Sequence, residues 1–153
     1  MQLNLPELHQ VIQDNDFKSV VTPRYNCVGF AIGDPNWWDH VGEEGTTWPA
    51  DLIGRGSLND YLEVFQRHGF RTCDRAEGTV AVPGWENIAV FQEAGEFSHV
   101  AIQLASGRWI SKLGDFEDIE HPLEPMEGRF YGDVSTFMKR EGYIDRKTRF
   151  PLV

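Results

Sequence analysis

The sequence is poor in cysteine and in basic residues, and it contains no long apolar run. Its two cysteines, Cys27 and Cys73, stand among 153 residues. Two thiols cannot build the disulfide framework of a small secreted domain. No Cys-x-x-Cys pair occurs and the five histidines are scattered along the chain, so no metal site is expected. These observations leave one chemistry open for the thiols, a reactive cysteine that works with a distant histidine.

Basic residues are outnumbered by acidic ones, with 14 Lys and Arg against 24 Asp and Glu and a net charge of −10. Such a surface repels phosphate backbones and anionic membranes, and no cluster of five basic residues occurs. No stretch approaches the roughly 18 apolar residues of a membrane span, and no signal peptide is visible at the N-terminus. We therefore expect no nucleic-acid partner and no membrane partner. The chain is expected to be cytoplasmic as synthesised, with signal-less export left open.

Length and composition predict a single domain over residues 1–153, with 41% hydrophobic residues to form its core. The first half predicts helices. One short helix is expected over residues 5–14. Asn26 as N-cap and Gly33 as a C-terminal stop predict a short buried helix whose first turn holds Cys27. Ser57 begins the clearest amphipathic helix of the sequence.

The second half predicts strands over residues 87–92, 99–104 and 108–113, joined by short turns. Acidic loops and a last short helix near residues 133–140 are expected to follow. Helices first and a run of strands afterwards indicate an α+β fold.

Between the two expected helices lies an irregular segment, residues 34–56, which contains Trp37, Trp38 and Trp48. Three indoles in one loop either pack over the core or line a groove. His40 in the same loop is either a substrate contact or a surface residue.

Cys27 and His99 are the residues in which a catalytic pattern is visible. A cysteine hydrolase needs a thiolate, a base that exchanges its proton and a third group that orients the base. A cysteine in the first turn of a helix is favoured as thiolate, and His99 opens an expected strand. The third group should lie on the neighbouring strand. Cys73 has no matching motif and is interpreted as structural.

Three local motifs carry a resemblance to a known family. Residues 26–30, Asn-Cys-Val-Gly-Phe, resemble the Asp-Cys-Ser-Gly-Phe/Leu signature of NlpC-type cell-wall peptidases. Residues 88–91, a turn, and His-Val-Ala-Ile at 99–102 are similar to the strand, turn and His-Val-Gly-Ile strand of these enzymes. Residues 105–110, Ala-Ser-Gly-Arg-Trp-Ile, resemble the hairpin that follows. The order of cysteine, histidine and polar residue is that of the papain-like superfamily, which includes the CHAP amidases.

The resemblance implies a papain-like α+β fold, with Cys27 on a helix packed against an antiparallel sheet. It implies that Cys27 is the nucleophile and His99 the base, and its third polar position falls on Ser111, with Asp115 or Glu117 as alternatives. The chain departs from the signature in having Asn26 where Asp is usual. No cofactor and no metal are implied. The residues expected to contact substrate are Tyr25, Asn26, Trp37 and Trp38.

The expected function is hydrolysis of a peptide or amide bond through a thioacyl intermediate on Cys27. The resemblance favours a peptidoglycan stem peptide, and the missing export signal is compatible with this substrate if the protein is an antibacterial effector injected by a secretion machine. An acyltransferase or a deamidase would use the same dyad. Two alternatives come from other classes of function. One is a non-catalytic binding domain whose recognition surface is the segment of residues 34–56, called the Trp loop below. The other is a redox role for Cys27. The biological partner is left open.

Overall fold

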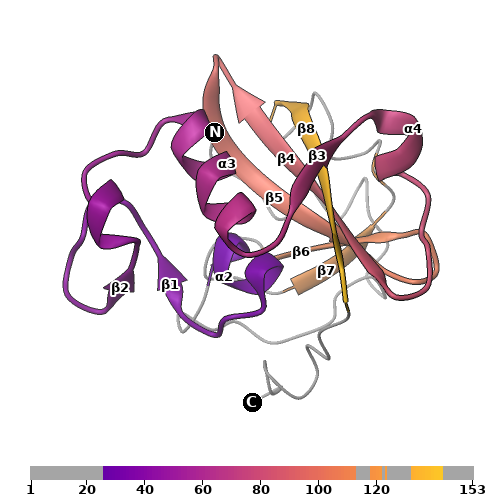
Figure 1. Cartoon of the computed structure of the whole chain (residues 1–153), viewed down its shortest axis with the longest axis horizontal. Helices are drawn as coiled ribbons and strands as arrows, with labels where there is room; N and C mark the ends of the chain where they lie inside the picture. The colour runs from indigo at the N-terminus through magenta and orange to yellow at the C-terminus, as the bar shows by residue number, and fades with distance from the viewer. Residues whose placement is uncertain (1–25, 113–117, 122, 124–131, 143–153) are drawn as a thin grey trace.

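The protein is described by a computed structural model at residues 26–112, 118–121, 123 and 132–142 (Figure 1). The helix expected over residues 5–14 lies outside this described part. No described helix is long and apolar enough to cross a membrane.

Three helices, a short 3-10 helix and eight strands make up the described chain. In chain order they are α2 (Cys27–Ile32), β1 (Trp37–Trp38), β2 (Thr46–Thr47), η2 (Ala50–Leu52), α3 (Leu58–Arg67), β3 (Arg71–Cys73), α4 (Arg75–Gly78), β4 (Trp85–Glu93), β5 (Glu96–Gln103), β6 (Trp109–Lys112), β7 (Asp118–His121) and β8 (Asp133–Glu141). The mixture confirms the expected α+β class.

Six strands form one antiparallel sheet in the order β3-β8-β4-β5-β6-β7. Strands β4 to β7 follow one another as a meander. The last strand, β8, returns across the sheet and pairs with β4 on one side and β3 on the other. Figure 1 shows α3 and α2 at the sheet and the small parallel pair β1–β2 to one side of them.

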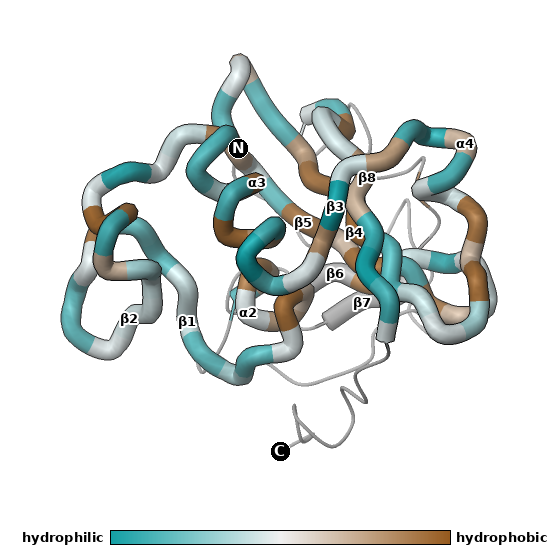
Figure 2. The backbone as a smooth tube through the Cα atoms, viewed as in Figure 1, coloured by the Kyte–Doolittle hydropathy of each residue, from teal (hydrophilic) through white to brown (hydrophobic). Residues whose placement is uncertain are grey.

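The main core lies between the sheet and the helices α2 and α3. Apolar residues gather in the middle of β4 and β5, whereas the loop around β1 and β2 is mostly hydrophilic (Figure 2). Residues of this core come from α2, from α3 and from alternate positions of the central strands. The six-stranded sheet contributes Ile88, Val90, Val100, Ile102, Ile110 and Met138 to this core, and β1 contributes Trp38.

The helix start expected at Ser57 is confirmed. The Ser57 hydroxyl accepts a hydrogen bond from the Asp60 N–H, and the Asp60 carboxylate accepts one from the Ser57 N–H, which is a reciprocal capping box. Gly69, just beyond α3, has φ of +92°, a value that side-chain-bearing residues adopt rarely. The local signals at this helix were therefore sufficient to place it.

The helix expected near residues 133–140 is wrong, because Asp133–Glu141 is the strand β8. Its position between β3 and β4 provides hydrogen-bond partners along both of its edges. Lys139 contacts Glu77 and Trp85 on one face, and Arg140 contacts Glu86 on the other. These partners come from distant parts of the chain, so the segment resembles a polar helix when it is considered alone.

Candidate active site

Cys27 is the first residue of α2, and the residue before it caps the helix. Asn26 has an extended backbone, and its Oδ1 accepts a hydrogen bond from the Gly29 N–H at 3.2 Å. Gly33 ends the helix in the left-handed conformation, with φ of +93°, and its N–H donates to the Gly29 carbonyl. The predicted N-cap and stop are thus both confirmed. Cys27 itself is half-buried.

Asn26 also ties α2 to the strand β1. Its Nδ2 donates to the Trp38 carbonyl at 2.7 Å, and its Oδ1 accepts a second bond from the Trp38 N–H at 3.2 Å. An aspartate could accept but could not donate to the carbonyl. Asparagine can make both bonds because its amide group has a donor and an acceptor. The Asn26 side chain is engaged in structural hydrogen bonds, so its role is to position α2 against β1.

Gly29 allows the chain after α2 to fold back closely on the helix. A Cβ atom at this position would lie 2.3 Å from the Asn36 carbonyl oxygen and 2.7 Å from that of Asp34. Backbone atoms cannot yield as a flexible side chain can. The glycine two residues after Cys27 is therefore required by this close approach.

His99 lies in β5 and is almost completely buried, with 2% of its surface exposed. It is opposite Phe91 of β4, and the two rings are 5.7 Å apart. The pairing of β4 with β5 shifts register directly beside this pair, and so does the pairing of β4 with β8. Such bulges bend a strand and redirect its side chains, and they are common next to active sites.

The strand that carries His99 packs against the helix that carries Cys27. Val100 and Ile102 of β5 belong to the core beneath α2. Because side chains alternate along a strand, His99 lies with Phe91 on the opposite face of β5 from Val100. Phe97, before the bulge, packs against the core that also contacts Cys27. The packing of α2 on β5 therefore brings the two elements together, whereas the His99 side chain lies on the other face of the strand from the core beneath α2.

The other predicted site residues are distributed as follows. Ser111 belongs to β6, which pairs with β5, so the strand expected to carry the third group is the neighbour of the His99 strand. Trp37 is a half-buried residue of β1, and Trp38 is 6% exposed with its ring against His68. Tyr25, Asp115 and Glu117 lie outside the described residues.

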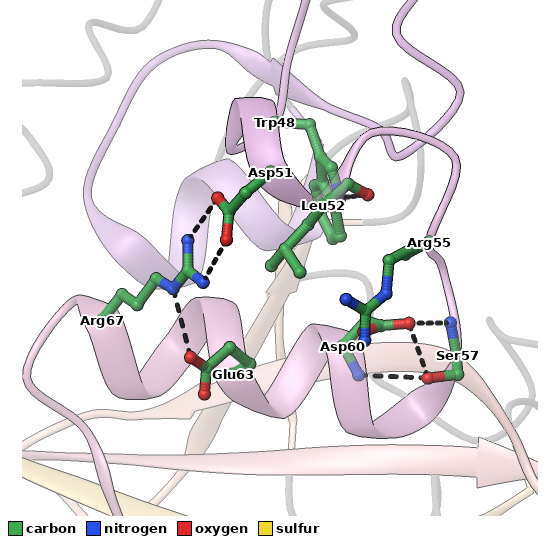
Figure 3. Close-up of polar contacts among 8 residues, drawn as sticks. All are labelled: Trp48, Asp51, Leu52, Arg55, Ser57, Asp60, Glu63 and Arg67. Carbon is green, nitrogen blue, oxygen red and sulfur yellow. Dashed lines mark hydrogen bonds and ion pairs between the residues drawn. The ribbon is translucent and has the colours of Figure 1, made fainter.

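The Trp loop packs over α3 and the core, which is one of the two arrangements predicted for it; the other was the lining of a groove. Trp48 is buried in the main core, and its Nε1 donates to the Leu52 carbonyl at 2.9 Å (Figure 3). Arg67 of α3 forms two hydrogen bonds to the Asp51 carboxylate, at 2.8 and 2.7 Å (Figure 3). These contacts hold the loop on the outer side of α3.

An aromatic cluster forms where the loop meets α3 and β5. Tyr61 of α3 stacks on Phe97 with ring centroids 3.9 Å apart and planes within 4°, and the Trp48 ring meets Tyr61 edge-on at 4.8 Å. His40 contacts both Trp48 and Tyr61. Gly56 leaves the space for the imidazole, since a Cβ there would lie 2.2 Å from the His40 ring. His40 is thus half-buried among aromatic rings.

Arg140 of β8 connects the two helices to the sheet, a role that sequence reasoning missed. Its Nη2 donates to the carbonyl of Ile32, the last residue of α2, at 2.8 Å. Its Nη1 donates to the carbonyl of His68, the C-cap of α3, at 3.0 Å. Its Nε and Nη2 both bind the Glu86 carboxylate, and the guanidinium lies over the Phe70 ring. No local pattern could reveal this group, because each partner is distant in sequence.

Cys73 and the acidic residues of the described part of the chain form no second candidate site. Burial raises the pKa of the Cys73 thiol, and the nearby Glu77 carboxylate adds to the effect. A thiol shifted in this direction is a poor nucleophile at neutral pH. Among the described residues, no three His, Cys, Asp or Glu side chains gather closely enough to hold a metal ion.

The sequence model of the DUF7689 family, a domain of unknown function, matches residues 17–139, so the chain belongs to this family. The matched range includes Cys27, His99 and Ser111. Comparison with curated proteins and with solved structures found no match.

Proposed function

We propose that this protein is a cysteine-nucleophile hydrolase of papain-like type that cleaves a peptide or amide bond. Cys27 is the nucleophile, His99 the base and Ser111 the group that orients the base. The observation that supports the proposal is the packing of α2 against β5, the strand of His99, and a productive dyad would require the His99 side chain to turn from the opposite face of β5 towards Cys27. The order of cysteine helix, histidine strand and neighbouring strand matches the resemblance to NlpC-type peptidases.

In this reaction the Cys27 sulfur attacks the substrate carbonyl carbon, and the carbonyl π electrons move to oxygen. His99 gives its proton to the leaving amine, which departs and leaves a thioacyl group on Cys27. The histidine then takes a proton from water as the water attacks the thioacyl carbon. The thiol is regenerated and the acid product leaves. A stem peptide of peptidoglycan is the substrate class that the resemblance favours.

The shape of the Trp loop bears on the rival binding-domain hypothesis. That hypothesis uses the loop as a recognition surface, but Trp38 and Trp48 are buried in the core, at 6% and 8% exposure. Two buried indoles are not available for recognition of a partner, so we favour the hydrolase.

The test is the rate of iodoacetamide alkylation of Cys27 between pH 5 and 10, followed by mass spectrometry of peptides. Wild type is compared with His99→Ala and with His68→Ala, a matched variant in another histidine. Cys73 serves as an internal reference thiol. We expect rapid labelling of Cys27 below pH 7 that His99→Ala shifts towards an ordinary thiol near pH 8.5 and that His68→Ala leaves in place.

A Cys27 profile with the pH dependence of an ordinary thiol in wild type would refute the dyad. So would a profile that His99→Ala leaves unchanged. If the early thiolate is found, incubation with peptides and muropeptides should give a thioacyl mass increase on Cys27.

A further inference from the structure

Asn26, directly before Cys27, binds three backbone groups with one side chain. Its Oδ1 accepts hydrogen bonds from the Gly29 N–H and the Trp38 N–H, both at 3.2 Å, and its Nδ2 donates to the Trp38 carbonyl at 2.7 Å. The first of these bonds caps α2, and the other two fasten β1 to the same point. The amide next to the proposed nucleophile is therefore held in one position.

Asparagine makes these bonds without carrying a charge. The N–H groups in the first turn of a helix carry positive partial charge, which favours the thiolate form of a cysteine in that turn. Cys27 is the first residue of α2, so it lies in such a turn. An aspartate at position 26 could accept the same two N–H bonds, and these bonds would hold its carboxylate one residue before Cys27. The negative charge would then oppose the formation of a thiolate.

We propose that Asn26 is a positioning residue for the reaction of Cys27: its uncharged amide fixes the first turn of α2 on β1 and leaves the positive field of that turn to the thiolate. The inference rests on the proposed function, in which Cys27 is the nucleophile. It goes beyond capping, because asparagine and aspartate cap a helix about equally well. What the neutral amide adds is a lower pH at which the sulfur becomes reactive.

Other titratable groups surround this turn. Helix α2 packs against β1, β5 and β6, and Cys27 shares a core with Tyr61 of α3. Burial raises the pKa of Tyr61 well above its usual range, so this phenol stays neutral throughout the assay described below. The titratable residues within the three strands, or close to β1 in sequence, are Asp34, Asp39, His40, Glu96, His99 and Lys112. Variants at position 26 retain all these groups, so a difference among them reports on residue 26.

The test is the pH dependence of iodoacetamide alkylation of Cys27, followed by mass spectrometry of peptides, in two variants of Asn26. Asn26→Asp can retain the two accepted bonds, loses the donor to β1 and adds a carboxylate. Asn26→Ser retains an uncharged helix cap and also loses the donor. Gln66→Glu, at an exposed position of α3, is the matched control for the change in net charge. Thermal unfolding establishes that each variant is folded at the temperature of the assay.

We expect Asn26→Asp to move the midpoint of alkylation to higher pH by about half a unit or more, which is the effect of a nearby charge that solvent partly screens. The rate reached at high pH should stay that of wild type, because the sulfur is equally accessible. Asn26→Ser and Gln66→Glu should both keep the wild-type midpoint, since neither places a charge beside Cys27.

The outcomes distinguish this proposal from the proposed function. An unchanged midpoint in folded Asn26→Asp overturns the role of Asn26 and leaves the dyad standing. A raised midpoint in Asn26→Ser also overturns it, because the lost bond to β1 would then be the cause, and this result decides the matter by itself if Asn26→Asp does not fold. The profile of an ordinary thiol in wild type, with a further rise in Asn26→Asp, would overturn the dyad and leave the effect of Asn26 on the thiolate.

Discussion

Arg140 should be one of the most important single residues for the stability of this protein. Its side chain is 11% exposed, and it faces a Glu86 side chain that is 7% exposed. Four hydrogen bonds leave its guanidinium, two to Glu86 and one each to the last carbonyl of α2 and the C-cap carbonyl of α3. Replacement by methionine retains part of the apolar stem and removes all four donors.

The cost can be estimated from what the substitution leaves behind. Breaking a buried ion pair by removing one partner costs about 3–5 kcal/mol, because the buried carboxylate loses its counter-charge. The two helix-end carbonyls lose their donor, and each buried acceptor without a partner adds about 1–3 kcal/mol if water cannot reach it. These contributions are not additive, since the same rearrangement relieves several of them. We expect Arg140→Met to lower the free energy of unfolding by about 4 kcal/mol or more, and the melting temperature by about 10 °C.

The assay is urea denaturation followed by fluorescence of the five tryptophans. Arg67→Met is the matched control, since Arg67 makes a two-bond ion pair with Asp51 in which both side chains are exposed, at 37% and 63%. Solvent screens such a pair, so a much smaller loss is expected. The double variant Arg140→Met/Glu86→Leu should recover stability relative to Arg140→Met, because no buried carboxylate remains. A loss for Arg140→Met no larger than that for Arg67→Met would refute the reasoning.

Three further predictions concern the helix ends. Gly29→Ala should destabilise the protein by about 1–3 kcal/mol or displace the following loop, because its Cβ would collide with the Asn36 carbonyl, and urea denaturation measures the loss. Asn26→Asp should retain the helix cap but lose the donor to β1, giving a measurable drop in melting temperature, whereas an unchanged value would contradict this role. Ser57→Ala should cost about 1 kcal/mol at neutral pH through loss of the cap. The Ser57 hydroxyl holds the pKa of Asp60 below its ordinary value of 3.8, so the wild type gains stability above that pH and loses it on acidification. In Ser57→Ala the loss between pH 5 and 2 should be shallower, and an equally steep acid limb would contradict the assignment.

The sequence by itself determined the local features around the proposed nucleophile. The N-cap at Asn26, the stop at Gly33 and the capping box at Ser57 all involve partners within four residues, so their residue types are sufficient to predict them. The strand that carries His99 was also predicted, because its apolar run and the turns on either side are local signals. These features rest on short-range hydrogen bonds and on periodicity, which a single sequence displays directly.

Only the tertiary structure decided which distant segments meet. Residues 133–141 form a strand because they pair with β3 on one side and with β4 on the other. Their charged residues, considered alone, suggested a polar helix. The Asn26 side chain holds β1 because it donates to the carbonyl of Trp38, twelve residues away. Arg140 is buried because two helix ends and Glu86 supply acceptors from three other segments. The free energy of each of these arrangements comes from pairing and burial between remote residues, and this is why residue type and spacing alone did not reveal them.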